Sequence, residues 1–94
     1  MKKILILGSS GSIGVNTLNV VRNFPDKFNV VGLTVNSRID VLEQQIKEFT
    51  PEFVVVTDES KAKELQSNIG NLCQVLFGYD ELLNAAKHRD YDIL

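Results

Sequence analysis

Near its start the chain passes from an uninterrupted apolar run, residues 4–7, directly into three evenly spaced glycines, Gly8, Gly11 and Gly14. An apolar run of this kind is typical of a parallel strand that is covered on both faces. Glycines let the backbone turn tightly, and the free N–H groups at the start of a following helix attract anions. The stretch therefore predicts a strand, a turn and a helix that together hold the phosphates of a nucleotide.

The three glycines suggest different roles within this turn. Gly8 would make the turn, Gly11 would let the backbone approach a pyrophosphate, and Gly14 would let the helix lie close to the sheet. Their spacing has one residue more than the commonest dinucleotide-binding pattern. A triphosphatase loop is disfavoured, because Val15 and Asn16 stand where that loop needs lysine and a hydroxyl residue. A dinucleotide is the favoured ligand, and the alternative is a tight turn that binds nothing.

Downstream, apolar runs alternate with segments of helical period. The expected strands are residues 3–7, 28–34, 53–56, 74–77 and 91–94, and the expected helices are residues 12–23, 39–49, 59–68 and 80–87. Pro25, Pro51 and Gly70 end the first three helices. This alternation predicts an α/β fold, a doubly wound parallel (Rossmann-type) sheet of about five strands with helices on both faces. The ligand would lie at the carboxyl ends of the strands, between the first and the fourth.

Helical spacing also predicts which side chains face the core. In the first helix these are Ile13, Leu18, Val20 and Val21, and in the last helix they are Leu82, Leu83 and Ala86. In the second helix the helical spacing includes one polar residue, Gln45, beside Leu42 and Ile46.

The end of the second strand indicates which dinucleotide is bound. NAD-dependent enzymes usually carry an acidic residue about 20 positions beyond the glycines, to hold the ribose 2′-hydroxyl. That acid is absent here, and Ser37 and Arg38 instead offer donors suited to a 2′-phosphate. A solvated surface charge is the alternative for Arg38, although the start of a helix is an unfavourable place for a purely structural cation. The pattern favours NADPH.

Composition limits the other possibilities. With 94 residues and a formal charge of −2, the chain is expected to form one small domain that does not attract nucleic acid. Cys73 is the single cysteine, which excludes an internal disulfide, and its apolar surroundings favour a buried thiol. No apolar run is long enough for a membrane span or a signal peptide, so a cytoplasmic location is expected. His88 is expected at the surface, and no residue is assigned as catalytic or metal-binding.

Several segments, in one order and at one spacing, resemble the N-terminal NADPH-binding part of the 1-deoxy-D-xylulose 5-phosphate reductoisomerase family. They are residues 8–14 (GSSGSIG), 17–18, 20–22, 25–28, 30–33, 44–45 and 49–51. The resemblance covers essentially the whole chain and is densest before Pro51. It implies an enzyme that isomerises and reduces 1-deoxy-D-xylulose 5-phosphate to 2-C-methyl-D-erythritol 4-phosphate in non-mevalonate isoprenoid synthesis. NADPH is the hydride donor in this family, and a divalent cation, Mg or Mn, is also required.

The resemblance also implies roles for individual residues. The family's nucleotide-contacting turn falls on Ser10, Gly11, Ser12 and Ile13, and its ribose-phosphate loop falls on Asn36, Ser37 and Arg38. Together with Gly8 and Gly14 these form the expected cofactor site. The family usually has threonine in place of Ser10 and glycine in place of Asn36. Serine keeps the hydroxyl, and asparagine still tolerates a left-handed backbone.

The family is much longer than this chain, and its metal ligands, substrate-phosphate groups and catalytic loop follow the position of Leu94. Residues 1–94 are therefore expected to be an incomplete N-terminal NADPH-binding domain without the catalytic and C-terminal domains. The piece alone would be inactive and prone to self-association, whereas the full-length enzyme would bind the sugar phosphate as a homodimer. Two alternatives remain open. One is another NADP-dependent reductase, such as a semialdehyde dehydrogenase or a dihydrodipicolinate-reductase-like enzyme, and the other is a non-enzymatic nucleotide-sensing module.

Overall fold

A computed structural model describes residues 1–87 and 90–94 of the chain. Within these residues one sheet contains β1 (Lys2–Ile6), β2 (Phe28–Val35), β3 (Phe53–Val56), β4 (Gln74–Phe77) and β5 (Asp92–Ile93). The helices between them are α1 (Ser12–Asn23), α2 (Ile39–Phe49), α3 (Glu59–Ile69) and α4 (Tyr79–Lys87). The predicted elements are confirmed, with small differences at their ends. The expectation for His88 lies outside the described residues.

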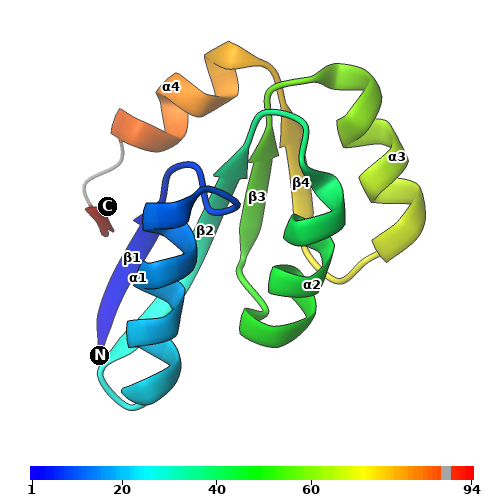
Figure 1. Cartoon of the computed structure of the whole chain (residues 1–94). Helices are drawn as coiled ribbons and strands as arrows, with labels where there is room; N and C mark the ends of the chain where they lie inside the picture. The colour runs from blue at the N-terminus through cyan, green and yellow to red at the C-terminus, as the bar shows by residue number, and fades with distance from the viewer. Residues whose placement is uncertain (88–89) are drawn as a thin grey trace.

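All recorded strand pairs are parallel, and the strands lie in the order β4-β3-β2-β1-β5. The chain steps in one direction from β1 to β4 and then returns to β5, on the other side of β1. Because right-handed crossovers that step in one direction place their helices on one face, α1, α2 and α3 share a face, and α4 covers the other. Figure 1 shows α4 crossing from the β4 edge back towards the C-terminus. The predicted doubly wound sheet is confirmed.

The predicted position of the reversal is wrong. It lies between β1 and β5 and not between the first and fourth strands, because β4 continues the outward series and pairs with β3 at the far edge. An alternating pattern does not encode this order, since crossovers to the near and far sides of a sheet have similar lengths. The turn after β1 nevertheless lies at the reversal, as the prediction required.

Two hydrophobic clusters cover the two faces of the sheet. The larger one joins β1, β2 and β3 to α1, α2 and α3, and its buried members include Ile4, Ile6, Leu18, Leu33, Leu42, Ile46, Val54 and Leu65. The smaller one contains Leu5, Val55 and Ala85. Ile4 and Leu5 belong to different clusters because successive side chains of a strand point to opposite faces. Burial on both faces explains why the strands read as uninterrupted apolar runs.

Three predicted core positions are wrong. Ile13 is 82% exposed, Val20 51% and Leu83 42%. In α1 the buried residues are Gly14, Leu18 and Val21, so the helix is rotated to press Gly14 against the turn. In α4 the buried residue is Ala85, and Leu82, three residues earlier, packs partly buried against the same cluster, so Leu83 points away from it.

The helix ends follow local signals in the sequence. Thr50 ends α2 with a left-handed φ of +44°, and Pro51 follows it. The Asp58 carboxylate accepts a hydrogen bond from the Lys61 N–H at 3.1 Å and so caps α3, which Gly70 ends with φ +60°. Cys73 lies just before β4, half-buried against the larger cluster, and burial raises the pKa of its thiol. None of the helices in the described residues is both long enough and apolar enough to cross a bilayer.

Candidate functional site

The turn after β1 has the geometry that the glycine spacing predicts. Gly8 has φ +65°, in the left-handed region that favours glycine. The Gly11 N–H donates to the Gly8 carbonyl oxygen at 3.0 Å, which closes the turn. Gly11 is also the N-cap of α1, and its extended backbone leads into the helix. The chain therefore passes from strand to helix within a few residues at the carboxyl edge of the sheet.

Gly14 and Gly11 differ in how much space surrounds them. A Cβ atom on Gly14 would lie 2.4 Å from the Gly8 carbonyl oxygen and 2.7 Å from the Ser9 Cα atom. A Cβ atom on Gly11 would lie 3.4 Å from the same Gly8 oxygen, with no closer neighbour. Gly14 thus allows α1 to touch the turn, whereas the absent side chain of Gly11 leaves the outer side of the turn accessible.

The start of α1 offers hydrogen-bond donors that the protein does not use. Among the described residues, no carbonyl oxygen accepts from the backbone N–H groups of Ser10, Ser12 or Ile13. The first turn of α1 contains no acidic side chain. Unpaired N–H groups and the positive end of the helix dipole both favour an anion at this point.

The loop after β2 lies at the same edge of the sheet and is hydrogen-bonded to the end of β3. The side-chain oxygen of Asn36 accepts from the Thr57 hydroxyl at 2.5 Å, and its carbonyl oxygen accepts from the Asp58 N–H at 3.0 Å. Ser37 is half-buried, and its carbonyl oxygen accepts from the Ile39 N–H at 2.8 Å. Asn36 does not use the left-handed backbone that asparagine tolerates. Among the described residues, Thr50 is the one non-glycine residue with positive φ.

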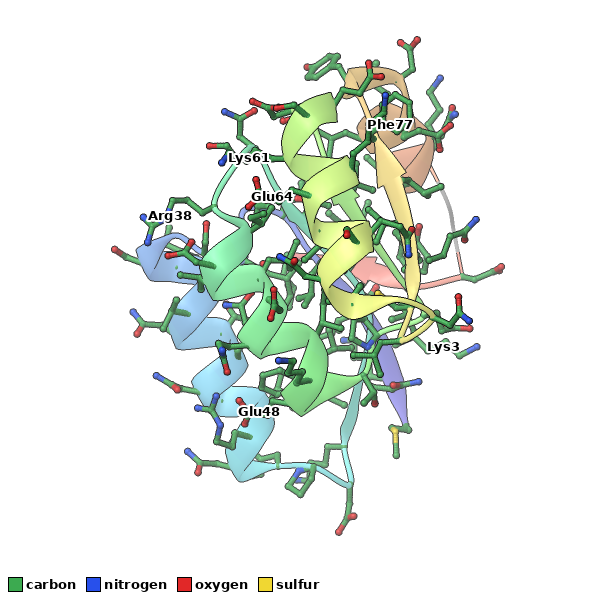
Figure 2. The ribbon with its side chains drawn as sticks, turned by 90° about the vertical axis from the view of Figure 1, so that its right-hand side faces the viewer. Lys3, Arg38, Glu48, Lys61, Glu64 and Phe77 are labelled. Atoms are coloured by element: carbon green, nitrogen blue, oxygen red, sulfur yellow. The ribbon has the colours of Figure 1, made fainter. Side chains whose placement is uncertain are left out.

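Arg38 is an exposed cation at the N-cap of α2. Its guanidinium lies 3.4 Å from the Asp40 carboxylate, and both side chains are open to solvent. A hydrogen bond from the Val41 N–H, with a smaller effect from Arg38, lowers the pKa of Asp40. Figure 2 shows Arg38 at the end of the molecule where α1 begins, and Glu48 towards the opposite end. A cation therefore stands at the same edge as the unpaired N–H groups.

Sequence reasoning missed three polar residues that hold the turn in place. Ser9, Thr34 and Gln45 are buried, and the Thr34 hydroxyl accepts from the Gly8 N–H at 3.1 Å. Gln45 makes two hydrogen bonds to Ser9. The available signal was an amide at a core-facing position of the second helix, since buried polar groups normally have a specific partner.

An open hollow of about 380 Å³ adjoins the turn on the α4 side of the sheet. Its lining is largely apolar and includes Leu7, Gly8, Val35, Asn36, Leu82 and Leu83. A second hollow, of about 420 Å³, lies at the other end of the same face, with Lys3, Glu52, Gln74 and Glu81 on its walls. None of the predicted site residues lines the second hollow, whereas Gly8 and Asn36 line the first.

The described residues contain no group of three or more His, Cys, Asp or Glu side chains that could hold a metal ion. Residues 1–87 and 90–94 therefore present donors for an anion and no ready set of metal ligands.

Sequence comparison relates the whole chain to one family. A family model described as 1-deoxy-D-xylulose 5-phosphate reductoisomerase matches residues 4–94. The protein of that name from Thermodesulfovibrio yellowstonii is 48% identical over 94 residues, which is 100% of this chain and 24% of the relative. The one from Geotalea uraniireducens is 45% identical over 95 residues, covering 100% of this chain and 25% of the relative. The chain thus spans about a quarter of the length of these relatives.

Solved structures agree with the sequence comparison. A DOX-P reductoisomerase with fosmidomycin and magnesium has a TM-score of 0.90 and 27% identity, over 99% of this chain and 24% of that one. The 1-deoxy-D-xylulose 5-phosphate reductoisomerase from Zymomonas mobilis, in complex with NADPH, has a TM-score of 0.85 and 28% identity, over 90% of this chain and 23% of that one. The likeness extends over nearly all of the sheet and its helices.

Proposed function

Because the chain belongs to the 1-deoxy-D-xylulose 5-phosphate reductoisomerase family, we propose that it is the N-terminal NADPH-binding part of an enzyme that converts 1-deoxy-D-xylulose 5-phosphate to 2-C-methyl-D-erythritol 4-phosphate. The observation that carries the proposal is the meeting of unpaired N–H groups and Arg38 at one edge of the sheet. NADPH, when bound, supplies the hydride for the reduction. The residues of this chain bind and orient it, and the groups that act on the sugar phosphate belong to the rest of a longer protein.

The glycine turn holds the pyrophosphate in this proposal. The N–H groups of Ser12 and Ile13 donate to phosphate oxygens, and the hydroxyl of Ser10 is a further donor. The missing side chain of Gly11 leaves room for the phosphate to approach the backbone. Gly8 and Gly14 act indirectly, since they permit the turn and its contact with α1.

The loop after β2 holds the adenosine half of the cofactor. The Ser37 hydroxyl and the Arg38 guanidinium donate to the 2′-phosphate, for which the planar fork of arginine is well suited. Asn36 lies beside the ribose, and its bond to Thr57 fixes the loop. The neighbouring hollow, with its apolar lining, has the size and character that a flat base requires.

The full-length protein is also expected to bind a metal ion, to lie in the cytoplasm and to form a dimer. A divalent cation is expected in the full-length protein, and the magnesium in the related solved structures supports this. Its ligands would lie outside the described residues of this chain. A cytoplasmic location is supported by the single thiol, because disulfides are a feature of exported proteins. A homodimer is supported by the family resemblance and by large exposed apolar side chains such as Phe77 and Tyr79.

Nucleotide binding by the full-length protein tests the proposal. NADPH should bind more tightly than NADH, and Arg38→Ala should weaken NADPH binding by about tenfold to a hundredfold with little effect on NADH, because one charge-assisted contact is lost. Lys47→Ala, an exposed cation near the other end of α2, is the matched control. Equal affinity for the two nucleotides, or equal losses in the Arg38 variant, would contradict the proposal.

Two outcomes separate this function from the alternatives. The full-length protein should oxidise NADPH in the presence of 1-deoxy-D-xylulose 5-phosphate, and membership of the family already argues against the semialdehyde dehydrogenase and dihydrodipicolinate-reductase-like enzymes. Residues 1–94 alone should bind NADPH weakly and catalyse nothing. Tight and selective NADPH binding by the 94-residue chain would instead support a nucleotide-sensing module.

A further inference from the structure

All the buried polar side chains of the described chain meet at one place. Ser9 is 0% exposed, Thr34 4% and Gln45 8%, and no other polar or charged side chain in the described residues is buried to this degree. Burial of a polar group costs free energy unless the group is hydrogen-bonded, and here each one has a partner. Their concentration behind the glycine turn indicates that this turn, more than the rest of the core, requires a fixed conformation.

Gln45 contacts Ser9 through both ends of its side-chain amide. Its Nε2 atom donates to the Ser9 carbonyl oxygen at 2.8 Å, and its Oε1 atom accepts from the Ser9 hydroxyl at 2.7 Å. The orientation of the amide is fixed, because a carbonyl oxygen can only accept. The Ser9 N–H donates to the Thr34 carbonyl oxygen at 2.9 Å. Every polar atom of Ser9 is therefore held, by α2 on one side and by β2 on the other.

The bond to the Ser9 carbonyl oxygen fixes the backbone next to the donors of the site. In a helix that began two residues earlier, at Ser10, this oxygen would accept from the N–H of Ile13, four residues later. The Gln45 amide donates to this oxygen instead, and α1 begins at Ser12. No bond joins the Ile13 N–H to the Ser9 oxygen, so this N–H is available to a ligand.

We infer that Gln45 is a positioning residue of the cofactor site, which holds the glycine turn in its anion-binding conformation before the cofactor arrives. The inference rests on the proposed function. One helix then serves both halves of the site, because α2 carries Arg38 at its N-cap and Gln45 on its buried face. A turn that is already ordered loses less conformational entropy on binding, so the Gln45 side chain contributes to affinity without touching the ligand.

The test uses Gln45→Leu in the full-length protein, a substitution that fills the space and removes both hydrogen bonds. The Kd and KM for NADPH should rise by about tenfold, as expected for losing hydrogen bonds that order the turn. The kcat and the KM for the sugar phosphate should stay within about twofold of the wild type. Ile46→Val is the matched control, because Ile46 is the next buried residue of α2 and has no hydrogen bond to the turn.

Hydrogen exchange distinguishes a local change in the turn from a general loss of stability, because a general loss would speed exchange at both sites compared here. The Ser9 N–H should exchange faster in Gln45→Leu, while the N–H of Ile46 within α2 keeps its wild-type rate. Ser9→Ala should have a smaller effect on both NADPH affinity and exchange, because the Gln45 Nε2 bond to residue 9 remains. Ser9→Ala also serves as the test if Gln45→Leu fails to fold.

Wild-type NADPH affinity in Gln45→Leu, or equal losses in Gln45→Leu and Ile46→Val, would overturn the inference. If the wild-type protein does not bind NADPH, the proposed function fails. The exchange rate of the Ser9 N–H then decides separately whether Gln45 holds the turn.

Discussion

Two glycines of the turn, Gly14 and Gly11, have different amounts of space around them. Their alanine variants should therefore differ in stability. In Gly14→Ala the new Cβ would lie 2.4 Å from the Gly8 carbonyl oxygen, so α1 must move away from the turn. We expect a loss of about 2 kcal/mol of unfolding free energy, together with loss of NADPH binding.

The Gly11→Ala variant is the matched control for this prediction. Its Cβ would lie 3.4 Å from the same oxygen, so stability should change little while NADPH affinity falls, because the methyl group stands where the pyrophosphate approaches. Urea unfolding and nucleotide titration measure the two effects. Equal destabilisation by the two variants would contradict the assignment of roles.

Thr50 is a site at which the native residue is strained. It ends α2 with φ +44°, a conformation that costs a β-branched residue about 1–2 kcal/mol. Thr50→Gly should raise the free energy of unfolding by about 0.5–1 kcal/mol, after allowing for the greater freedom of glycine in the unfolded chain. Thr50→Ala should give no comparable gain, since it keeps a Cβ atom. A lower urea midpoint for Thr50→Gly would show that this end of the helix is not strained.

Individual residues also show where sequence reasoning succeeds and where it stops. The turn and its glycines could be predicted because φ and Cβ constraints are local. Ile13 was expected in the core and is exposed, because helical spacing does not reveal that Gly14 sets the rotation of α1. Gln45 was placed on the correct helix face, but its partner is 36 residues away and cannot be deduced from spacing.

At the scale of elements, the alternation of strands and helices predicts every element of the described sheet but not their order. Each apolar run is bounded by local signals such as Pro51 and Gly70, so its position is set by nearby residues. The placement of β4 beside β3, and of β5 beside β1, depends on which edge each crossover reaches. The edge that each crossover reaches depends on packing across the whole sheet and cannot be predicted from the local sequence pattern.

Carboxylates at the starts of helices, and one that bridges two helices, make stability depend on pH. The pKa of Asp40 is lowered by the Val41 N–H, that of Asp58 by the Lys61 N–H, and that of Glu48 by the Arg22 guanidinium. Because these pKa values are lower in the folded chain than in the unfolded chain, their contribution is complete above about pH 4–5. It is lost as the pH falls through the folded-state values.

We therefore expect the urea midpoint to fall steadily below about pH 4. Asp58→Asn should flatten part of this fall, because asparagine also caps a helix but does not titrate. A midpoint that is constant or rises on acidification would contradict this account of the helix ends.

At the scale of the whole molecule, the face that carries α4 is thinly covered. Large apolar side chains remain exposed on or near it, including Leu7, Tyr79, Leu83 and Leu94. Exposed apolar patches and open sheet edges favour association. Residues 1–94 produced alone should therefore associate with increasing concentration in sedimentation velocity experiments. Leu83→Lys, on the exposed side of α4, should reduce this association, and a monomer at all concentrations would contradict the prediction.

The central claim is that the glycine turn is the pyrophosphate site of NADPH. A crystal structure of the full-length protein with NADPH tests it most directly. The pyrophosphate oxygens should lie within about 3.2 Å of the N–H groups of Ser12 and Ile13, with the 2′-phosphate beside Ser37 and Arg38. A cofactor bound elsewhere on the protein, with this turn left to solvent, would contradict the claim.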